Sequence, residues 1–327
     1  MSFSSTIARL CGPVRIGDEL RLVRQYVVDW SRFRRYSGIS GSAGTGLTSR
    51  VVMDAHRIEK GLALRSPKPW FGKDALVRLA ENVAQLPATR DTHVMHARLM
   101  AHGAAAAYFA HFESSGLDEP EWAEAVRREL LPAVVDSGYG GTKPRTVKEC
   151  FDVDAFDTFV ESRESIRHFS DDPVPLVEIE AAARVAATSP SVCNRQGSRV
   201  RAFERGAAAD ALLRHQRGNT GFGSDASHIL LVTHDLGTMV TPAERNQGYV
   251  DGGLYAMTLV YALHARRIGT CCLNWSATPT QDRGLRREIG LPDNEVVIMM
   301  MAVGYPDPAA AVSISSTRGG RFSVGMG

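Results

Sequence analysis

A change of pattern near residue 150 divides this sequence into two parts that we expect to fold differently. Before it, apolar residues recur at the spacing of amphipathic helices, and Gly, Ser or Pro separates one helical stretch from the next. The predicted helices are residues 18–36, 74–86, 92–113 and 119–135. We therefore predict that residues 1–150 form an all-helical N-terminal extension, in which residues 37–49 are a Gly- and Ser-rich linker.

After residue 150, short apolar runs alternate with helical patterns. The predicted strands are residues 199–204, 228–234, 269–275 and 295–303, of which the last is the most apolar. The predicted helices are residues 155–162, 175–188, 249–267 and 285–289. Because strands and helices mixed in this way are typical of the α+β class, we predict an α+β domain over residues 151–327.

Charge and cysteine content argue against several classes of protein. The 327-residue chain has 38 basic and 36 acidic residues and a net charge of +2, so we expect neither nucleic acid nor a membrane as a partner. No apolar run approaches the roughly 20 residues of a membrane span, and no secretory signal is apparent. Five cysteines without a C-x-x-C pair fit neither a disulfide framework nor a zinc site. We expect no metal and a reducing, cytoplasmic location.

Two other patterns lack part of what their chemistry needs. Residues 41–48 nearly spell a phosphate-binding loop, but Leu47 stands where the lysine belongs and no buried strand precedes it, so we interpret the stretch as a linker. The histidines at 93, 96 and 102 have no nearby carboxylate or thiolate to complete a metal site.

Three separated segments fit one ligand. In Arg163-Glu164-Ser165-Ile166-Arg167, two guanidinium groups and a hydroxyl suit a phosphate monoester, although a solvated basic helix end explains the same residues equally well. Residues 189–196 offer amides that suit the polar edge of a planar heterocycle, or form an ordinary capping loop. Residues 269–275 offer strand backbone to a ring, or are a core strand.

Taken in this order, the three segments resemble the FMN-dependent nitroreductase family. R-x-S-I-R is followed by Phe169 and then by P-S-x-x-N-x-Q, and a late basic residue follows Val303-Gly304-Tyr305-Pro306. Asp225-Ala-Ser-His, the Asp251-Gly-Gly helix and Ile268-Gly-Thr-Cys lie between them. The resemblance covers about residues 150–327. The extension resembles, more loosely, that of nitroreductase-like proteins associated with polysaccharide gene clusters.

The resemblance implies a mostly antiparallel central sheet flanked by helices, and a homodimer with FMN at the subunit interface. Arg163, Ser165 and Arg167 would hold the FMN phosphate, with Glu164 supplying backbone. From the other subunit, Pro190, Ser191, Asn194 and Gln196 would reach the flavin. Cys272, Leu273 and Asn274 match the strand whose backbone lies against the ring. Arg318 matches the residue that completes the phosphate clamp, with Arg321 as the alternative.

Other residues take weaker roles from the same resemblance. Asn219 is a candidate at the ring, and Arg195 and Arg217 are candidates for a cation beside it. Asn246, Gln247 and Tyr249 are candidates for the acceptor pocket, or belong to a loop that begins a helix. His56, Glu59 and Lys60 would form a lid, against the simpler interpretation of solvated helix charges.

The implied reaction is ping-pong hydride transfer from NADH or NADPH through FMN to a small organic acceptor. The flavin carries the chemistry, so no catalytic side chain is required. The alternative is an FMN-binding protein without independent turnover, acting as a partner or regulator in a biosynthetic complex, and a third hypothesis is a member that consumes flavin or uses oxygen.

Overall fold

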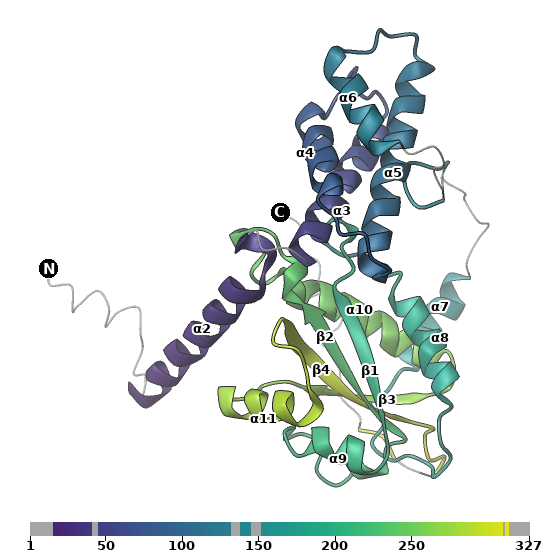
Figure 1. The fold of residues 1–327 in the computed structure, drawn as a ribbon. Helices are drawn as coiled ribbons and strands as arrows, with labels where there is room; N and C mark the ends of the chain where they lie inside the picture. Colours follow the sequence, from purple (N-terminus) through teal and green to yellow (C-terminus); the bar gives the residue numbers. More distant parts are fainter. Residues whose placement is uncertain (1–15, 41–44, 132–137, 145–151, 310, 314–327) are drawn as a thin grey trace, which may run out of the picture.

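The computed structural model describes residues 16–40, 45–131, 138–144, 152–309 and 311–313. In this part of the chain, helices α2 to α6 precede a four-stranded sheet with its own helices (Figure 1). The first group is α2 (Ile16–Tyr36), α3 (Thr45–Leu62), α4 (Lys73–Ala84), α5 (Thr92–Glu113) and α6 (Glu121–Leu130). The predicted α+β class and the helical N-terminal part are confirmed. The boundary predicted at residue 150 lies outside the described residues.

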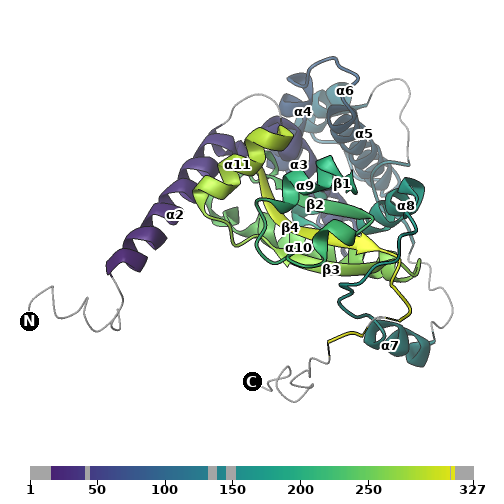
Figure 2. The ribbon, with the colours of Figure 1, turned by 90° about the horizontal axis from the view of Figure 1, so that it is seen from below.

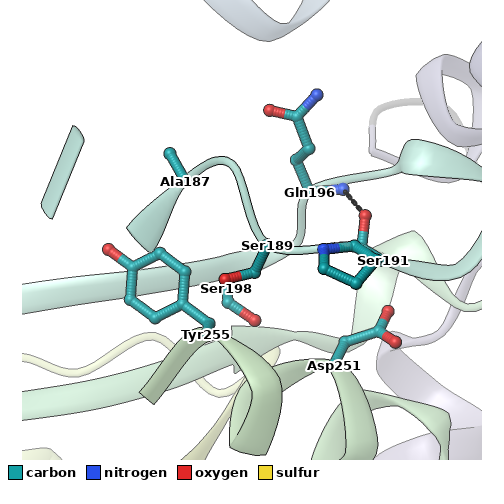
Figure 3. A pocket seen from close by; sticks show the side chains of 8 residues that line it. Ala187, Ser189, Ser191, Gln196, Ser198, Asp251 and Tyr255 are labelled. Atoms are coloured by element: carbon teal, nitrogen blue, oxygen red, sulfur yellow. Dashed lines mark hydrogen bonds between the residues drawn. The ribbon is translucent and has the colours of Figure 1, made fainter. Parts of the chain in front are cut away.

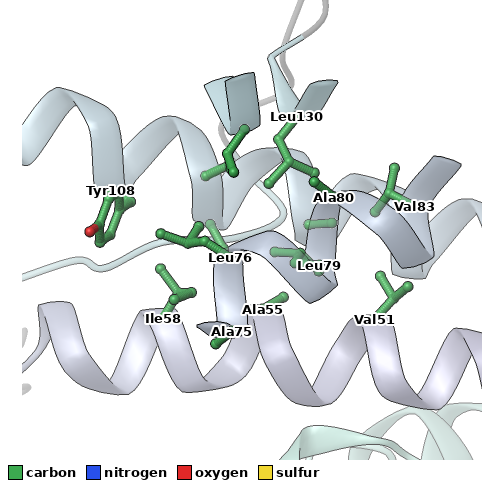
Figure 4. Packing of buried hydrophobic residues seen from close by; sticks show 14 of the residues in the cluster. Val51, Ala55, Ile58, Ala75, Leu76, Leu79, Ala80, Val83, Tyr108 and Leu130 are labelled. Carbon is green, nitrogen blue, oxygen red and sulfur yellow. The ribbon is translucent and has the colours of Figure 1, made fainter. Parts of the chain in front are cut away.

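Helices α3 to α6 pack into a unit with a hydrophobic core of its own. Val51, Leu76, Leu79 and Tyr108 are fully buried in it, and the helices meet along these positions (Figure 4). Helix α3 includes His56, Glu59 and Lys60, which we interpreted as ordinary helix charges, but its start was predicted wrongly: the Gly- and Ser-rich pattern of residues 37–49 indicated a linker, and the helix already begins at Thr45. The buried residues of α3, from Val51 to Ile58, explain why packing overrides the weak local propensity.

The second half is a sheet covered on both faces by helices. Its elements are α7 (Val153–Glu161), α8 (Leu176–Ala186), β1 (Ser198–Glu204), α9 (Ala207–Leu213), β2 (His228–Asp235), α10 (Gln247–His264), β3 (Gly269–Asn274), α11 (Pro279–Ile289) and β4 (Glu295–Gly304). All four predicted strands are present. Helix α9 was not predicted, and α11 begins six residues before the predicted helix.

The sheet order is β1-β2-β4-β3, with every neighbouring pair antiparallel. The most apolar strand, β4, lies inside the sheet between β2 and β3. Helices α8 and α10 pack on one face against Leu230 and Met301, and α9 and α11 pack on the other against Leu231 and Met300. The two edges of the sheet, β1 and β3, are therefore where backbone and side chains remain open to a ligand.

Within the described residues, five short 3-10 turns connect these elements: η1 (Gly38–Ser40), η2 (Val192–Asn194), η3 (Gly223–Asp225), η4 (Leu236–Thr238) and η5 (Pro242–Glu244). Helix α2 projects from the body of the molecule and is joined to it near its C-terminal end (Figures 1 and 2). There the backbone N–H of Gly38 donates to the carbonyl of Met239, 2.8 Å away.

Candidate functional site

The arginine-rich segment follows α7 as extended chain. Ser165 pairs with Thr270 of β3 in a parallel bridge, and the N–H of Ile166 donates to the Thr270 carbonyl at 3.0 Å. The N–H of Arg163 still donates to the carbonyl of Val160 in the turn that ends α7, so only Ser165 is bridged to the sheet. Arg163 lies near the thiol of Cys272, and Arg167 lies near that of Cys271. The bridge therefore places the segment beside β3, with the two arginines on either side of Ser165 along the chain.

Ile166 explains why this segment stays against the sheet. A Cβ added to Gly269 would lie only 2.8 Å from Cγ1 of Ile166, so the missing side chain of this glycine lets the two backbones approach. Ile166 faces the sheet, while Ser165 and Arg167 are exposed and Arg163 is half-buried. The sequence R-x-S-I-R therefore has its anchoring residue at the isoleucine.

Strand β3 presents two of its three predicted site residues to solvent. Cys272 and Asn274 are exposed, whereas Cys271 and Leu273 are buried in the core on the other side of the strand. Leu273 has only its backbone to offer a ligand. Burial raises the pKa of the Cys271 thiol, and the nearby charge of Arg167 opposes that rise. The vicinal cysteines are thus not equivalent: one is a core residue, and the other belongs to the exposed face.

A cavity of about 560 Å³ opens beside the start of β3. Arg163, His264, Arg267 and Tyr305 line it, and Nε2 of His264 lies 2.9 Å from the hydroxyl of Ser162. Its size is in the range of small-molecule sites, and it contains two guanidinium groups. Arg267 and His264 were missed in the sequence because the end of α10 carries no motif and reaches this cavity only through the fold.

The loop before β1 has a strained backbone. Cys193, Asn194 and Gln196 have φ of 49°, 55° and 49°, in the left-handed region that residues other than glycine seldom adopt. Such a conformation persists only where surrounding contacts impose it. Here Oδ2 of Asp251 accepts from the N–H of Val192 at 3.1 Å, and the hydroxyl of Ser191 accepts from the N–H of Gln196 at 3.0 Å (Figure 3).

Arg195 is the third anchor of this loop. Its guanidinium is buried, with Nη2 2.5 Å from Oε1 of Glu244, and it also donates to the carbonyls of Val192 and Thr238. Burial by itself would raise the pKa of Glu244, but hydrogen bonds from Arg195 and from the N–H of Val240 lower it overall. The prediction that Arg195 offers a cation to a ring was wrong, because its charge is used inside the chain.

The free groups of the loop point outward. Asn194 and Gln196 are exposed, and Nε2 of Gln196 donates to Oδ1 of Asn194 at 3.3 Å. The cavity behind the loop, which Ser191, Asp251 and Tyr255 help to line, measures only about 80 Å³ (Figure 3). That volume is too small for a coenzyme, so a ligand of that size can meet this loop only from outside.

The loop and the arginine segment lie at diagonally opposite corners of the sheet. The loop leads into Ser198, which pairs with the end of β2 at His234, while Ser165 sits against the start of the opposite edge strand. Strands β2 and β4 lie between the two edges. Strand spacing and rise put the corners about 24 Å apart. One chain therefore does not bring together all the residues that were predicted for one site.

The helical unit supports the loop directly. Helix α3 packs on η2, and the hydroxyl of Ser49 donates to the carbonyl of Gly237 at 3.4 Å. A Cβ on Gly237 would lie 2.7 Å from Cβ of Thr45, which shows how closely α3 approaches η4. No sequence pattern pointed to this contact, because it joins segments about 190 residues apart.

The remaining candidates divide by what they contact. Gln247 donates to Oδ1 of Asp251 at 2.8 Å, and Nδ2 of Asn219 donates to the carbonyl of Gln216 at 2.6 Å, so both amides serve the fold. Asn246 is exposed at the start of α10. Tyr249 lines a cavity of about 400 Å³ together with Arg32 of α2.

Arg217 remains a candidate cation: it is exposed and lines a cavity of about 350 Å³ beside Asn274. His56 pairs with Glu59 at 3.1 Å, and Glu59 accepts from the N–H of Gly141. These contacts hold the two side chains within the helical unit, as ordinary helix charges. Arg318 and Arg321 lie outside the described residues.

A comparison with models of protein families finds a match in the second half of the chain. The model of the nitroreductase family matches residues 160–220 and 202–305. None of the curated proteins matches the chain. Among the helices that the structure describes, none has both the length and the apolar composition of a membrane span.

Similar solved structures include three that cover about half of this chain. A putative nitroreductase in complex with FMN from Desulfovibrio desulfuricans is 23% identical, with 51% of this chain and 93% of that chain covered and a TM-score of 0.45. A putative NADH dehydrogenase/NAD(P)H nitroreductase from Parabacteroides distasonis is 19% identical (50% and 94% covered, TM-score 0.44). A nitroreductase with bound FMN from Bacteroides fragilis is 16% identical (52% and 97% covered, TM-score 0.42).

Proposed function

Because residues 160–305 belong to the nitroreductase family, we propose that this chain is an FMN-dependent oxidoreductase whose flavin site is shared by two copies of the chain. The observation that carries the proposal is the bridge between Ser165 and Thr270, which holds the segment with Arg163 and Arg167 beside β3, whose Cys272 and Asn274 are exposed. This arrangement supports a site in which the segment binds the phosphate and the exposed face of β3 meets the ring.

The donor set fits the phosphate of FMN. Guanidinium groups pair with phosphate oxygens in forked geometry, and charge-assisted hydrogen bonds are roughly twice as strong as neutral ones. The hydroxyl of Ser165 adds a donor between the two arginines. Arg267, across the neighbouring cavity from Arg163, adds positive charge. Arg318 would complete this clamp.

The exposed face of β3 fits the ring. Cys272 and Asn274 alternate with buried residues, so the backbone of this edge strand and two short side chains face the same way. The unpaired N–H and C=O groups of an edge strand are available as hydrogen-bond partners. The backbone at Leu273 would serve the ring in the same manner.

A second copy supplies the other half of the site. Pro190, Ser191, Asn194 and Gln196 belong to a corner about 24 Å from the arginine segment, so in a single chain they cannot meet the same flavin. An exposed apolar stripe on α10, formed by Val250, Leu254 and Met257, offers a surface on which two copies can pack. We therefore propose a homodimer with two equivalent sites.

When bound, FMN would take a hydride from NADH or NADPH and pass it to a small organic acceptor in a second half-reaction. The chain contributes the phosphate grip, the orientation of the ring against β3 and the preformed loop of the partner. No side chain needs to act as acid or base. Tyr249, beside a cavity of about 400 Å³ that Trp275 also lines, is the residue we assign to acceptor binding. We place the enzyme in the cytoplasm and its domain boundary near residue 150.

Absorbance and rapid mixing test this function. Purified protein should show flavin bands, release FMN on denaturation, and bleach promptly when mixed with NADPH or NADH without oxygen. A protein that stays colourless after incubation with FMN would refute the cofactor. Stable flavin that neither nicotinamide bleaches would refute turnover and favour an FMN-binding partner protein. Recovery of unchanged FMN after aeration would exclude flavin consumption.

A further inference from the structure

Helix α2 has its apolar side turned away from its own chain. Leu20, Val23, Val27 and Trp30 recur at helical spacing, and between 55% and 66% of each of these residues is exposed. An amphipathic helix normally buries such a stripe against its own core. Here the 21 residues, about 30 Å of helix, project from the body (Figures 1 and 2).

The polar side of α2 faces the body instead. Nη2 of Arg32 lies 2.5 Å from Oδ2 of Asp282, and the hydroxyl of Tyr36 donates to Asp293 at 3.0 Å. Gln25 lines the cavity between α2 and the sheet domain. At 100° per residue, Gln25, Arg32 and Tyr36 share one side and the apolar stripe occupies the other. These polar contacts fix the direction of the helix and leave its apolar face outside.

We propose that α2 is an arm that packs on the second copy of the chain within the flavin-sharing dimer. The inference rests on the proposed function, because that site needs a second copy. In it, the sheet corner beside Ser165 of one copy (the arginine corner) meets the sheet corner at Ser198 of the other (the loop corner). The C-terminal end of α2 lies at the loop corner. The N–H of Gly38, just after the helix, donates to the carbonyl of Met239, and Arg195 of the loop donates to the carbonyl of the adjacent Thr238. The arm therefore starts where the two copies meet.

The arginine corner carries a charge-complementary surface. Helix α7 immediately precedes Arg163 and bears Asp154, Asp157 and Glu161, all exposed and without an ion pair among the described residues. Val153 of the same helix is 68% exposed. Exposed Arg24 and Arg35 lie beside the apolar stripe of α2, and Arg34 lies over the ring of Trp30 within it. In the proposed dimer, where the loop corner of one copy meets the arginine corner of the other, the basic α2 of one copy would therefore reach the acidic α7 of its partner.

Helix α10 carries a second exposed apolar stripe, formed by Val250, Leu254 and Met257. Tyr249, which precedes this stripe, lines the cavity on the polar side of α2 with Gln25 and Arg32, so the stripes of α2 and α10 are separate surfaces. A membrane is the other possible occupant of a basic amphipathic helix, and the experiment separates the two.

The test uses the full-length, FMN-loaded protein and the variant Val27→Glu, with Gln25→Glu as the matched control. Both variants add one negative charge to exposed positions of α2, but on opposite sides of the helix. Sedimentation equilibrium should show at least a tenfold weaker dimer for Val27→Glu and a change of less than twofold for Gln25→Glu. An unchanged dimer in Val27→Glu would overturn the proposal. Binding to anionic vesicles is measured for the same proteins, and a Val27→Glu variant that loses vesicle binding but still dimerises would also overturn it.

A charge exchange locates the arm. Arg24→Glu alone and Asp157→Arg alone should each weaken the dimer, and the double variant should recover most of the loss. Failure of the double variant to recover would overturn the pairing of α2 with α7. Wild-type FMN content is measured first: a wild-type protein without FMN refutes the proposed function, whereas a flavin-loaded dimer that tolerates Val27→Glu refutes the arm alone.

Discussion

Nη2 of Arg195 lies 2.5 Å from Oε1 of Glu244, and the pair holds the strained loop before β1 in place. Breaking a buried ion pair from one side leaves an uncompensated charge, at a typical cost of about 3–5 kcal/mol. Glu244→Gln should lower the free energy of unfolding by about 3 kcal/mol and weaken FMN binding at least tenfold, since Asn194 and Gln196 lose their fixed directions. Urea unfolding and FMN titration measure both. The control is Glu180→Gln, which changes an exposed residue of α8. Equal FMN affinity in the two variants would contradict the role of the loop.

Replacing Arg163 and Arg167 together by Ala should remove the cofactor without unfolding the chain. Each guanidinium is expected to contribute about 1.5–3 kcal/mol through charge-assisted hydrogen bonds, so FMN affinity should fall more than 100-fold. Circular dichroism checks the fold, and absorbance after gel filtration measures retained FMN. The control replaces two other exposed arginines, Arg128 and Arg184. Stoichiometric FMN in the double variant would show that the phosphate lies elsewhere.

The sequence predicted the elements of the second half better than it predicted their assembly. The β2 and β4 patterns were clear because both strands are buried and strongly apolar. The first turns of α3 were missed because Thr45 to Ser49 have the composition of a loop, and the stability of the helix comes from packing on α5 and η4. The R-x-S-I-R residues were identified by type, whereas their place beside β3 depends on the pairing of Ser165 with Thr270, about 105 residues away.

Arg195 shows the limit of assigning a role by residue type. A guanidinium next to the motif asparagine suggested a cation for the ring, yet its partner Glu244 is 49 residues away and no local pattern announces the pair. The left-handed backbone at three neighbouring residues was equally invisible, because Cys, Asn and Gln carry no signal for it as strong as that of glycine.

Bound FMN should protect the thiol of Cys272. This side chain lies on the exposed face of β3, where the ring is proposed to rest, so a bound flavin would block access to it. Alkylation of Cys272, followed by peptide mass spectrometry, should be at least tenfold slower in the holoprotein than after removal of FMN. Cys271 is buried and should react slowly in both forms. Equal rates for Cys272 with and without flavin would place the ring on another surface.

His234 should make stability depend on pH. Burial lowers the pKa of this imidazole to about 4 from 6.5, and nearby Asp251 and Asp235 only partly oppose that effect. Thr238 donates to the carbonyl of Asp235, so it accepts from Nε2–H of His234, and Nδ1 accepts from Ser198. The imidazole is therefore held neutral next to the loop.

The sign follows from proton binding. Because the unfolded chain takes up a proton at higher pH than the folded chain does, the stability is fully present above pH 6.5 and is lost as the pH falls from 6.5 to about 4. The loss from this group should be on the order of 3 kcal/mol. Unfolding measured across this range should show a smaller slope for His234→Gln than for the wild type. If the free energy of unfolding changed with pH equally in both proteins, protonation of His234 would carry no free-energy cost in the folded chain.

The shared site is tested most directly by a heterodimer of two defective chains. One chain carries Arg163→Ala and Arg167→Ala, and the other carries Asn194→Ala and Gln196→Ala, with different tags for purification. If each flavin is held by the arginines of one subunit and the loop of the other, the heterodimer has one intact site and should bind one FMN with nearly wild-type affinity, while both variant homodimers bind weakly. A heterodimer that binds no FMN tightly, or a wild-type chain of 35.5 kDa that holds FMN as a monomer, would contradict the account.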